Sequence, residues 1–338
     1  MKILQISPTY SGIGGIAQHV RGLEKYLTNT GNDVDILSSD NSFTLPIKGL
    51  KNPSFMLSSS VKTRFMKKHD IIHAHNIPSA KAMKNAKGKK ILTIHGIFSE
   101  QIDILHGKTT ANISKKYEIN ALESADAITV VSKDAKEYYS KLGFNVHHIP
   151  NAIDIDSLPK NENKMFDNQI IFVGRLSKEK GILKLLSISK ELPKEIHLII
   201  VGIGPEENNV KIASKQKNIH YLGYLPPEKT IPLIRGSKIL VQPSLVEGIS
   251  STILESMACQ TSIIASNVGG NSELIKNNEN GILMDTQNSD SLLEQIISLI
   301  DNKELRKSFE NKSLKFVEKY DWNKIGENYL KIYKSLLD

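Results

Sequence analysis

Cysteine is almost absent from the chain: Cys259 is the only one among 338 residues. A single cysteine excludes an internal disulfide and any metal site built from several thiolates. Burial of apolar side chains must therefore hold the fold together, and a chain of this length favours two domains over one. We expect Cys259 itself to be a small core residue.

Long hydrophobic runs are missing as well. No apolar stretch reaches the ~18 residues that are needed to span a membrane. Residues 1–7 are too few and too mixed for a signal peptide, and their pattern is typical of a first β-strand. We therefore expect a cytoplasmic protein.

Acidic side chains are scarce between Lys48 and Lys90, where the sequence has 11 basic residues and one acidic residue. Such a stretch is either a solvated surface or a region that attracts an anion, such as a membrane lipid. Five large apolar residues stand among these lysines: Phe55, Met56, Leu57, Phe65 and Met66. This mixture favours an anionic membrane surface, at the inner face of the cell membrane, over a nucleic acid, for which the sequence has no motif.

Apolar strands alternate with helical segments along the chain, a pattern that predicts two α/β domains with parallel sheets. In the first half, strands are predicted near residues 2–7, 33–38, 70–75, 90–96 and 125–132. In the second half, they are predicted near residues 170–173, 197–201, 219–222, 239–241 and 262–265. The polar residues 156–168 are typical of a linker, and residues 324–337 are predicted to form a terminal helix.

A glycine-rich loop with Gly12, Gly14 and Gly15 follows the first strand. Together with Ala17 it matches the dinucleotide fingerprint, but four residues separate the strand from the first glycine. The loop is therefore too long for that tight turn, and a glycine loop that lines a cleft is favoured over a nicotinamide site.

Histidines close two of the predicted strands of the first half: His73 and His75 on one strand, and His95 on the next. The two-residue period places His73 and His75 on the same side. Ligands bind at the carboxyl edge of open α/β sheets, so these side chains are either structural residues or ligand contacts. His95, which precedes Gly96, is the best candidate for a ligand contact.

A turn rich in hydroxyl groups joins a strand to a helix in the second half: Glu247, Gly248, Ile249, Ser250, Ser251, Thr252, Ile253, Leu254 and Glu255. The first turn of a helix has unpaired backbone N–H groups and a positive dipole end, so it can bind a phosphate. Thr252 and Glu255 also fit a capping box, in which Glu255 bonds back to the backbone of Thr252. Either interpretation fits these nine residues.

Two cations flank an earlier loop of the second half, Arg175 and Lys180. Arginine offers a planar fork to phosphate oxygens and lysine a mobile charge. With the helix start in the turn between Glu247 and Glu255, they could hold a diphosphate from two sides.

The chain thus contains, in order, Gly174-Arg175-Leu176-x3-Lys180-Gly181, Glu247-Gly248-x6-Glu255 and Gly269-Gly270-x2-Glu273. This series resembles the retaining glycosyltransferases of the GT-B fold, specifically glycosyltransferase family 4. The resemblance extends back to Gly14-Gly15 and covers almost the whole chain. It departs from the family pattern at Asn271 and Ala152, and neither departure affects a charged residue.

The resemblance implies two Rossmann-like α/β domains that face each other across a cleft. Residues 1–155 would bind the acceptor, residues 156–318 would bind the nucleotide-sugar donor, and residues 319–338 would form a helix that crosses back onto the first domain. The implied reaction is the transfer of a sugar from a UDP- or GDP-sugar to a glycan or lipid-linked acceptor, with retention at the anomeric carbon. The alternative is a nucleotide-sugar epimerase of the same fold. No cofactor and no metal ion would be needed.

The resemblance also implies the roles of single residues. The catalytic residues would be Arg175, Lys180, Glu247 and His95, of which Arg175 and Lys180 hold the diphosphate and Glu247 contacts the donor sugar. Glu255 would bind the ribose and point into the cleft, while Thr252 caps the helix. The remaining donor contacts would be Gly14, Gly15, Gly174, Gly204, Tyr224, Leu225, Gly248, Ile249, Ser250, Ser251, Thr252, Ile253 and Leu254.

Overall fold

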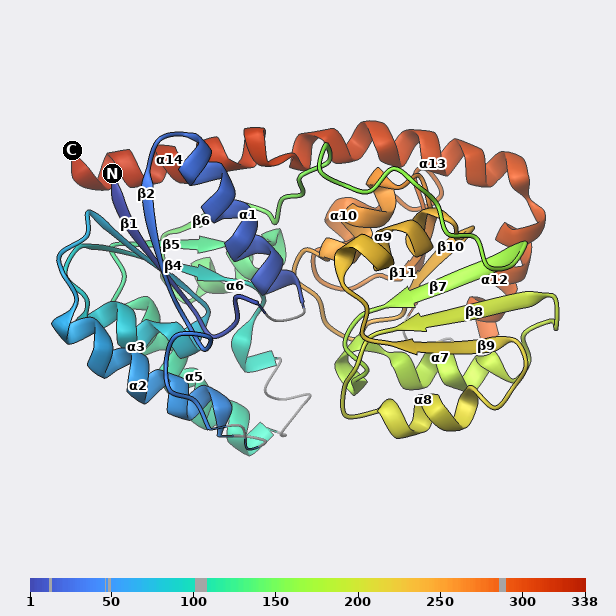
Figure 1. Ribbon diagram of the computed structural model, residues 1–338, viewed down its shortest axis with the longest axis horizontal. Coiled ribbons are helices and arrows are strands. Elements are labelled where there is room, and N and C mark those ends of the chain that lie inside the picture. Colours follow the sequence, from blue (N-terminus) through green and yellow to red (C-terminus); the bar gives the residue numbers. More distant parts are fainter. Residues whose placement is uncertain (12–13, 46, 48–49, 101–107, 286–289) are drawn as a thin grey trace. The chain divides into compact units, whose positions relative to one another are not determined.

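The computed structural model describes residues 1–11, 14–45, 47, 50–100, 108–285 and 290–338. These residues form two compact units, Met1–Ala152 together with Tyr320–Asp338, and Ile153–Lys319. Each unit contains a parallel six-stranded sheet with helices between its strands (Figure 1). The expected α/β class with two parallel sheets is therefore confirmed. Among the described helices, none is both long and apolar enough to cross a bilayer.

The sheet of the first unit has the strand order β2-β1-β3-β4-β5-β6. Its strands are β1 (Lys2–Ser7), β2 (Asp33–Ser38), β3 (Ile71–His75), β4 (Lys89–Ile94), β5 (Ala127–Val130) and β6 (Val146–His148). Its helices are α1 (Gly15–Asn29), α2 (Lys51–Phe65), α3 (Ile77–Asn85), α5 (Lys108–Leu122), α6 (Lys133–Lys141) and α14 (Trp322–Leu337). The strands match the predicted ones to within a few residues.

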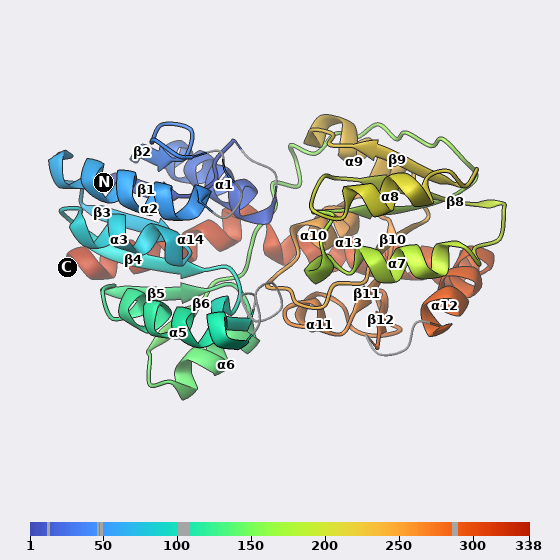
Figure 2. The same cartoon turned by 90° about the horizontal axis from the view of Figure 1, so that it is seen from below.

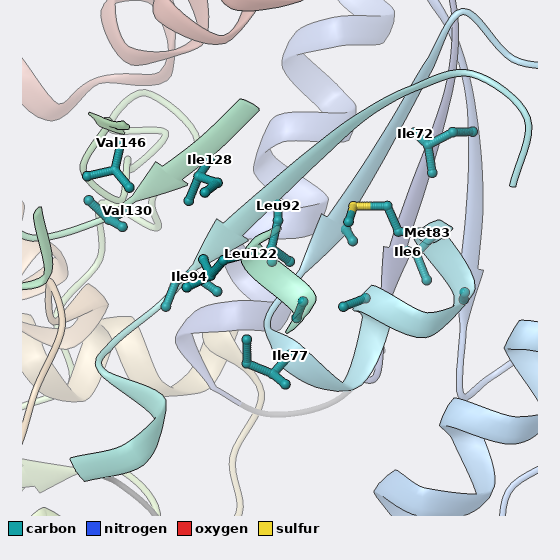
Figure 3. Close-up of a cluster of buried hydrophobic side chains, with 14 of the residues drawn as sticks. Ile6, Ile72, Ile77, Met83, Leu92, Ile94, Leu122, Ile128, Val130 and Val146 are labelled. Carbon is teal, nitrogen blue, oxygen red and sulfur yellow. The ribbon is translucent and has the colours of Figure 1, made fainter. Parts of the chain in front are cut away.

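Strand alternation divides the first unit into two apolar layers. Ile6, Ile72 and Leu92 pack with residues of α2, α3, α5 and α6 on one face of the sheet (Figures 2 and 3). Ile3 and Ile71 belong to the other face, where they pack with residues of α1 and α14. Successive side chains of a strand point to opposite faces, so the polar residues Gln5, His73, His75 and Thr93 also lie on the α1 and α14 face.

The last helix of the chain, α14, belongs to the first unit. Its side chains Trp322, Tyr329 and Tyr333 are buried against that face. Two glycines allow α1 and α14 to approach closely: a Cβ atom at Gly22 would lie 2.2 Å from Nε1 of Trp322, and one at Gly326 would lie 2.3 Å from Cδ1 of Tyr26. The packing of α14 therefore depends on the absence of side chains at these positions.

The sheet of the second unit has the strand order β12-β11-β10-β7-β8-β9. Its strands are β7 (Asn168–Val173), β8 (Ile196–Val201), β9 (Ile219–Gly223), β10 (Ile239–Gln242), β11 (Ser262–Ser266) and β12 (Ile282–Met284). Its α-helices are α7 (Ile182–Ser189), α8 (Glu207–Ala213), α9 (Pro227–Arg235), α10 (Ser251–Ala258), α11 (Asn271–Leu274), α12 (Asp290–Asp301) and α13 (Lys303–Val317). Short 3₁₀ turns lie at η1 (Lys178–Lys180) and η2 (Glu318–Tyr320).

Cys259 is buried after α10, as expected, and burial raises the pKa of its thiol to about 12.

Strand order reverses once in each sheet. In the second unit the chain runs from β7 outward to β8 and β9, and β10 then returns to the other side of β7. In the first unit the reversal lies between β1 and β3. The loops that leave such a pair diverge to opposite faces, and ligands of open α/β sheets bind at the carboxyl ends of the strands there. The pairs β7 and β10, and β1 and β3, therefore mark the edges at which to look for a site.

Gly22→Ala should destabilise the first unit, because the added methyl group would collide with Trp322. Overpacking of this kind costs about 1–3 kcal/mol, although Ala in an open helix position would normally gain about 0.5–1 kcal/mol over Gly. Trp322 is the only tryptophan, so its fluorescence during urea unfolding reports on this unit. The control, Thr28→Ala at an exposed position of α1, should change stability by no more than about 0.5 kcal/mol. An unchanged or higher midpoint for Gly22→Ala would contradict the packing argument.

Candidate functional site

The candidate site lies at the carboxyl edge of the second sheet, where β7 and β10 are neighbours. Parallel pairing of Ile239 with Ile170 places the ends of both strands at the same edge. The loop after β7 carries Arg175 and Lys180, and the loop after β10 carries Glu247. The topology therefore brings together three of the predicted site residues.

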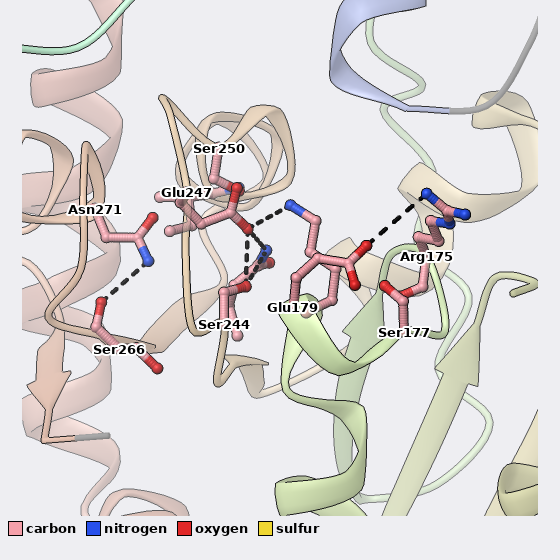
Figure 4. Close-up of polar contacts among 11 residues, drawn as sticks. Arg175, Ser177, Glu179, Ser244, Glu247, Ser250, Ser266 and Asn271 are labelled. Atoms are coloured by element: carbon pink, nitrogen blue, oxygen red, sulfur yellow. Dashed lines mark hydrogen bonds and ion pairs between the residues drawn. The ribbon is translucent and has the colours of Figure 1, made fainter. Parts of the chain in front are cut away.

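Glu247 is the centre of the polar contacts at this edge (Figure 4). Its Oε1 atom accepts hydrogen bonds from Nζ of Lys180 at 2.7 Å, from Nε2 of Gln242 at 2.8 Å and from Oγ of Ser244 at 2.8 Å. The Glu247 side chain is only 6% exposed and that of Lys180 is 28% exposed. The carboxylate is thus held from three directions, and its ion pair with Lys180 is largely shielded from water.

Arg175 is held much more loosely. Its side chain is 61% exposed, and Nη1 lies 3.9 Å from Oε1 of Glu179 (Figure 4). An exposed ion pair at this distance contributes little to stability. The second oxygen of Glu179, Oε2, is buried and has no hydrogen-bond partner among the described residues. The guanidinium is therefore tethered near the edge and free to reorient toward an anion.

Glycines join the loops of this edge by backbone contact. A Cβ atom at Gly181 would lie 1.7 Å from the carbonyl oxygen of Pro243, and one at Gly269 would lie 1.9 Å from that of Glu247. Three further glycines are packed in the same way: Gly202 against Gly174, Gly204 against Leu176, and Gly270 against Gly248. The predicted glycine turns thus fix the loops against one another, and any role in binding a ligand directly stays a prediction.

Helix α10 begins at Ser251, and Ser250 caps it: Oγ of Ser250 accepts from the backbone N of Ile253 at 3.4 Å. The prediction that Thr252 caps the helix was wrong, because Thr252 already lies in the first turn. Ile253 and Leu254 are fully buried, and their backbone N atoms donate to Oγ and to the carbonyl oxygen of Ser250, respectively. Ile249 is also buried, whereas Ser251 and Thr252 are half-buried.

Glu255 is half-buried within α10, and its predicted direction stays a prediction. Tyr224 and Leu225 follow β9, and the side chain of Tyr224 is exposed. Leu225 lines a cavity of about 510 Å³ together with Met165, Leu222 and Pro232, and the lining includes none of the charged residues at the β7 and β10 edge. The proximity of Tyr224 and Leu225 to a bound base stays a prediction.

The remaining predicted residues, Gly14, Gly15 and His95, belong to the first unit. Gly14 precedes α1 with φ 119°, a conformation that favours glycine. Gly12 of the dinucleotide-like pattern lies outside the described residues. His95 follows β4, and its backbone N donates to Oδ1 of Asn76 at 2.8 Å.

His95 is part of a buried histidine cluster. Its Nε2 lies 3.2 Å from Nδ1 of His75, and His73 is hydrogen bonded to Tyr333 and Thr93 at 2.6 Å each. Burial lowers the pKa of His95 to about 4. Burial, together with the smaller effect of the neighbouring His95, lowers the pKa of His73 to about 3. These imidazoles are therefore neutral at pH 7. Both ring nitrogens of His73 are engaged within the unit, so His73 serves the structure, which is one of the two interpretations that the sequence left open.

Sequence reasoning missed three residues that hold the site together: Glu179, Gln242 and Ser244. Glu179 adjoins Arg175, while Gln242 and Ser244 bind Glu247. The sequence did contain a signal for Gln242, because a polar residue at the end of the otherwise apolar strand β10 indicates a side chain at the carboxyl edge of the sheet. Nothing in the sequence distinguished Glu179 from the other charged residues around it.

Two protein-family models match the chain. Residues 154–316 match the family described as glycosyl transferases group 1, and residues 13–157 match glycosyltransferase family 4. An uncharacterized glycosyltransferase of Methanocaldococcus jannaschii is 29% identical, with 100% of this chain and 99% of the relative covered. A phosphatidyl-myo-inositol mannosyltransferase of Mycolicibacterium smegmatis is 22% identical, with 99% and 94% covered.

Solved structures share the fold. A sucrose-phosphate synthase from Thermosynechococcus elongatus superposes with a TM-score of 0.84 at 19% identity, over 99% of both chains. HepE of Anabaena, in complex with UDP-glucose, superposes with a TM-score of 0.75 at 18% identity, over 99% of this chain and 100% of that one. The two-sheet architecture is therefore that of GT-B glycosyltransferases.

Glu247→Ala should destabilise the second unit, because it removes the acceptor of three hydrogen bonds and the counter-charge of Lys180. Buried donors left without a partner cost about 1–3 kcal/mol. Glu247→Gln retains an acceptor oxygen and should fall between wild type and Ala. Urea unfolding followed by far-UV circular dichroism measures this order, with Glu279→Ala at an exposed position as the control. Equal stability of Glu247→Ala and wild type would refute the structural role of this carboxylate.

Proposed function

Because the chain belongs to the group 1 glycosyltransferases, we propose that it transfers a sugar from a UDP- or GDP-sugar to a glycan or lipid-linked acceptor with retention at the anomeric carbon. The observation that carries the proposal is the meeting of Lys180, Arg175 and the start of α10 at the reversal point of the second sheet. The UDP-glucose bound to HepE supports a nucleotide-sugar donor. The lipid substrate in the name of the mannosyltransferase relative supports a lipid-linked acceptor.

In this mechanism the second unit binds the donor. The barrier to transfer is the departure of the diphosphate, so stabilisation of its charge is the largest contribution. Arg175 reaches the diphosphate from its exposed position, and Lys180 shares its ammonium between Glu247 and a phosphate oxygen. The first-turn N–H groups of α10 complete the anion site. These groups take the place of a metal ion in the transfer step.

Glu247 keeps a second role in the proposed site. Its Oε1 atom is engaged by three donors in the protein, so the carboxylate has a fixed orientation before the donor binds. A fixed carboxylate can accept hydrogen bonds from sugar hydroxyls without loss of side-chain freedom. Glu255 is proposed to accept from the ribose, and His95 of the first unit to contact the sugar.

Arg175→Ala and Lys180→Ala should each reduce transfer by on the order of 10²–10³ fold, because each removes charge stabilisation from the leaving group. The donor is first chosen by a thermal-shift panel of UDP- and GDP-sugars, and transfer is then followed with the labelled donor. Lys178→Ala is the matched control, since Lys178 is an exposed lysine of the same 3₁₀ turn. Unchanged transfer in both site variants would refute the roles of these cations. An epimerised sugar nucleotide formed from the donor alone would instead support the epimerase.

The proposal includes a surface of the first unit that binds an anionic membrane, and this surface is formed by α2. Leu57, Val61 and Phe65 are exposed, and Phe65 is 85% exposed. Their spacing of four places them on one side of the helix. The opposite side buries Ser59, Ser60 and Thr63 against the unit. Apolar side chains that point outward, next to the exposed Lys62 and Arg64, are typical of a helix that lies in a lipid interface.

The triple variant Leu57→Ser/Val61→Ser/Phe65→Ser should bind anionic vesicles at least several-fold more weakly than wild type in sedimentation, because it removes the apolar face. Lys62→Gln/Arg64→Gln should also weaken binding, and salt should weaken wild type. Vesicles of phosphatidylglycerol are compared with vesicles of phosphatidylcholine. Ile212→Ser, which removes an exposed apolar residue of α8, is the control. If the wild-type protein did not bind anionic vesicles at low salt, α2 would not be a membrane-binding surface.

A further inference from the structure

Three buried histidines of the first unit come together from three elements. His19 lies on α1, His75 ends β3, and His95 follows β4. One ring nitrogen from each lies within 4.8 Å of the others, and all three side chains are buried. Clusters of imidazoles without carboxylates are the donor set that Zn²⁺ and similar transition metals prefer over Mg²⁺ or Ca²⁺.

Hydrogen bonds to oxygen atoms outside the cluster orient two of the three rings. Nε2 of His75 lies 3.0 Å from Oε1 of Gln5, and Nε2 of His19 lies 3.2 Å from the hydroxyl oxygen of Tyr329. Both outer nitrogens can therefore carry their protons toward oxygen, which leaves Nδ1 of His19 and His75 as electron-pair donors. Nδ1 of His19 is buried and has no hydrogen-bond partner within 3.5 Å among the described residues, although the amide of Asn151 lies nearby.

His95 completes the set. Its Nε2 lies 3.2 Å from Nδ1 of His75, which matches the edge of about 3.3 Å expected between two imidazole nitrogens bound at 2.0–2.1 Å to a tetrahedral Zn²⁺. The side chain of Asn151 contacts the ring of His95. His75 and His19 thus each have an outer partner, Gln5 and Tyr329, whereas Nδ1 of His95 is buried without a hydrogen-bond partner among the described residues. Outer partners of this kind orient the ligands in histidine metal sites.

We propose that His19, His75 and His95 form a site for a transition-metal ion of the Zn²⁺ class, with Gln5 and Tyr329 as orienting residues. The ion replaces the hydrogen bond between His75 and His95: the proton on Nε2 of His95 moves to Nδ1 of the same ring, beside Asn151. His19 supplies its Nδ1 as the third ligand. The site lies wholly in the first unit, and it shares one residue, His95, with the sugar contact of the proposed function.

The experiment is a titration of the full-length protein with Zn²⁺ alone, without any sugar nucleotide, so that failure of the proposed function does not affect the result. Calorimetry should give one Zn²⁺ per chain, and Co²⁺ should produce the visible absorption of a tetrahedral complex. X-ray absorption of the Zn²⁺ form of the wild-type protein should show three imidazole nitrogens. This last measurement requires no variant and therefore no assumption about how a variant folds.

Variants then locate the site. His75→Gln should abolish the tetrahedral Co²⁺ spectrum, and Gln5→Leu, which removes an orienting oxygen, should weaken Zn²⁺ by about 10–100 fold. Two controls remove other histidines: His147→Gln at an exposed position, and His197→Gln/His220→Gln at a hydrogen-bonded pair of the second unit. No Zn²⁺ binding, fewer than three imidazoles, or binding that is lost in the controls and kept in His75→Gln would overturn the proposal and leave the cluster as a hydrogen-bonded core.

Discussion

The close approach of loop backbones at the carboxyl edge is the constraint on which the second unit depends. Gly181 lies against the carbonyl of Pro243, and Gly269 lies against that of Glu247. The backbone N of Leu245 also donates to the carbonyl of Glu179 at 2.8 Å. Since no Cβ atom fits at these contacts, the loops after β7, β10 and β11 cannot move apart independently. Lys180 and Glu247 are therefore held at ion-pair distance by the backbone as well as by their own charges.

This arrangement divides the candidate site into a rigid part and an adaptable part. Glu247 is buried and bound by three donors, so a ligand meets it in a fixed position. Arg175 is exposed and lies 3.9 Å from Glu179, so a ligand has to order it. A preorganised carboxylate provides orientation at little entropic cost, whereas the arginine provides charge that arrives with the ligand. In the proposed transfer, orientation of the sugar and stabilisation of the leaving group fall to these two parts.

The sequence allowed the strands to be predicted because interior parallel strands such as β8 are apolar runs with glycine after them. Helix α2 was not predicted, since Phe55 is the one large apolar residue that it buries beside Ser59, Ser60 and Thr63, whereas Leu57, Val61 and Phe65 point outward. Periodicity indicates which residues share a side, but not which side is buried. The prediction of the residue that caps α10 was wrong for a similar reason. Ser250, Ser251 and Thr252 can each cap a helix, and only the backbone conformation selects Ser250.

The histidine cluster shows what strand patterns cannot supply. The two-residue period placed His73 and His75 on one side correctly, but their partners come from distant parts of the chain. Tyr333, which binds His73, and Tyr329, which adjoins His19, both lie on the last helix. Whether a strand-end histidine faces a ligand or the core is decided by what covers that face of the sheet. Here α14 covers it, and Gly22 and Gly326 allow α14 to lie close enough to do so. A glycine in α1 is thus part of the reason why histidines at the end of β3 are buried and neutral.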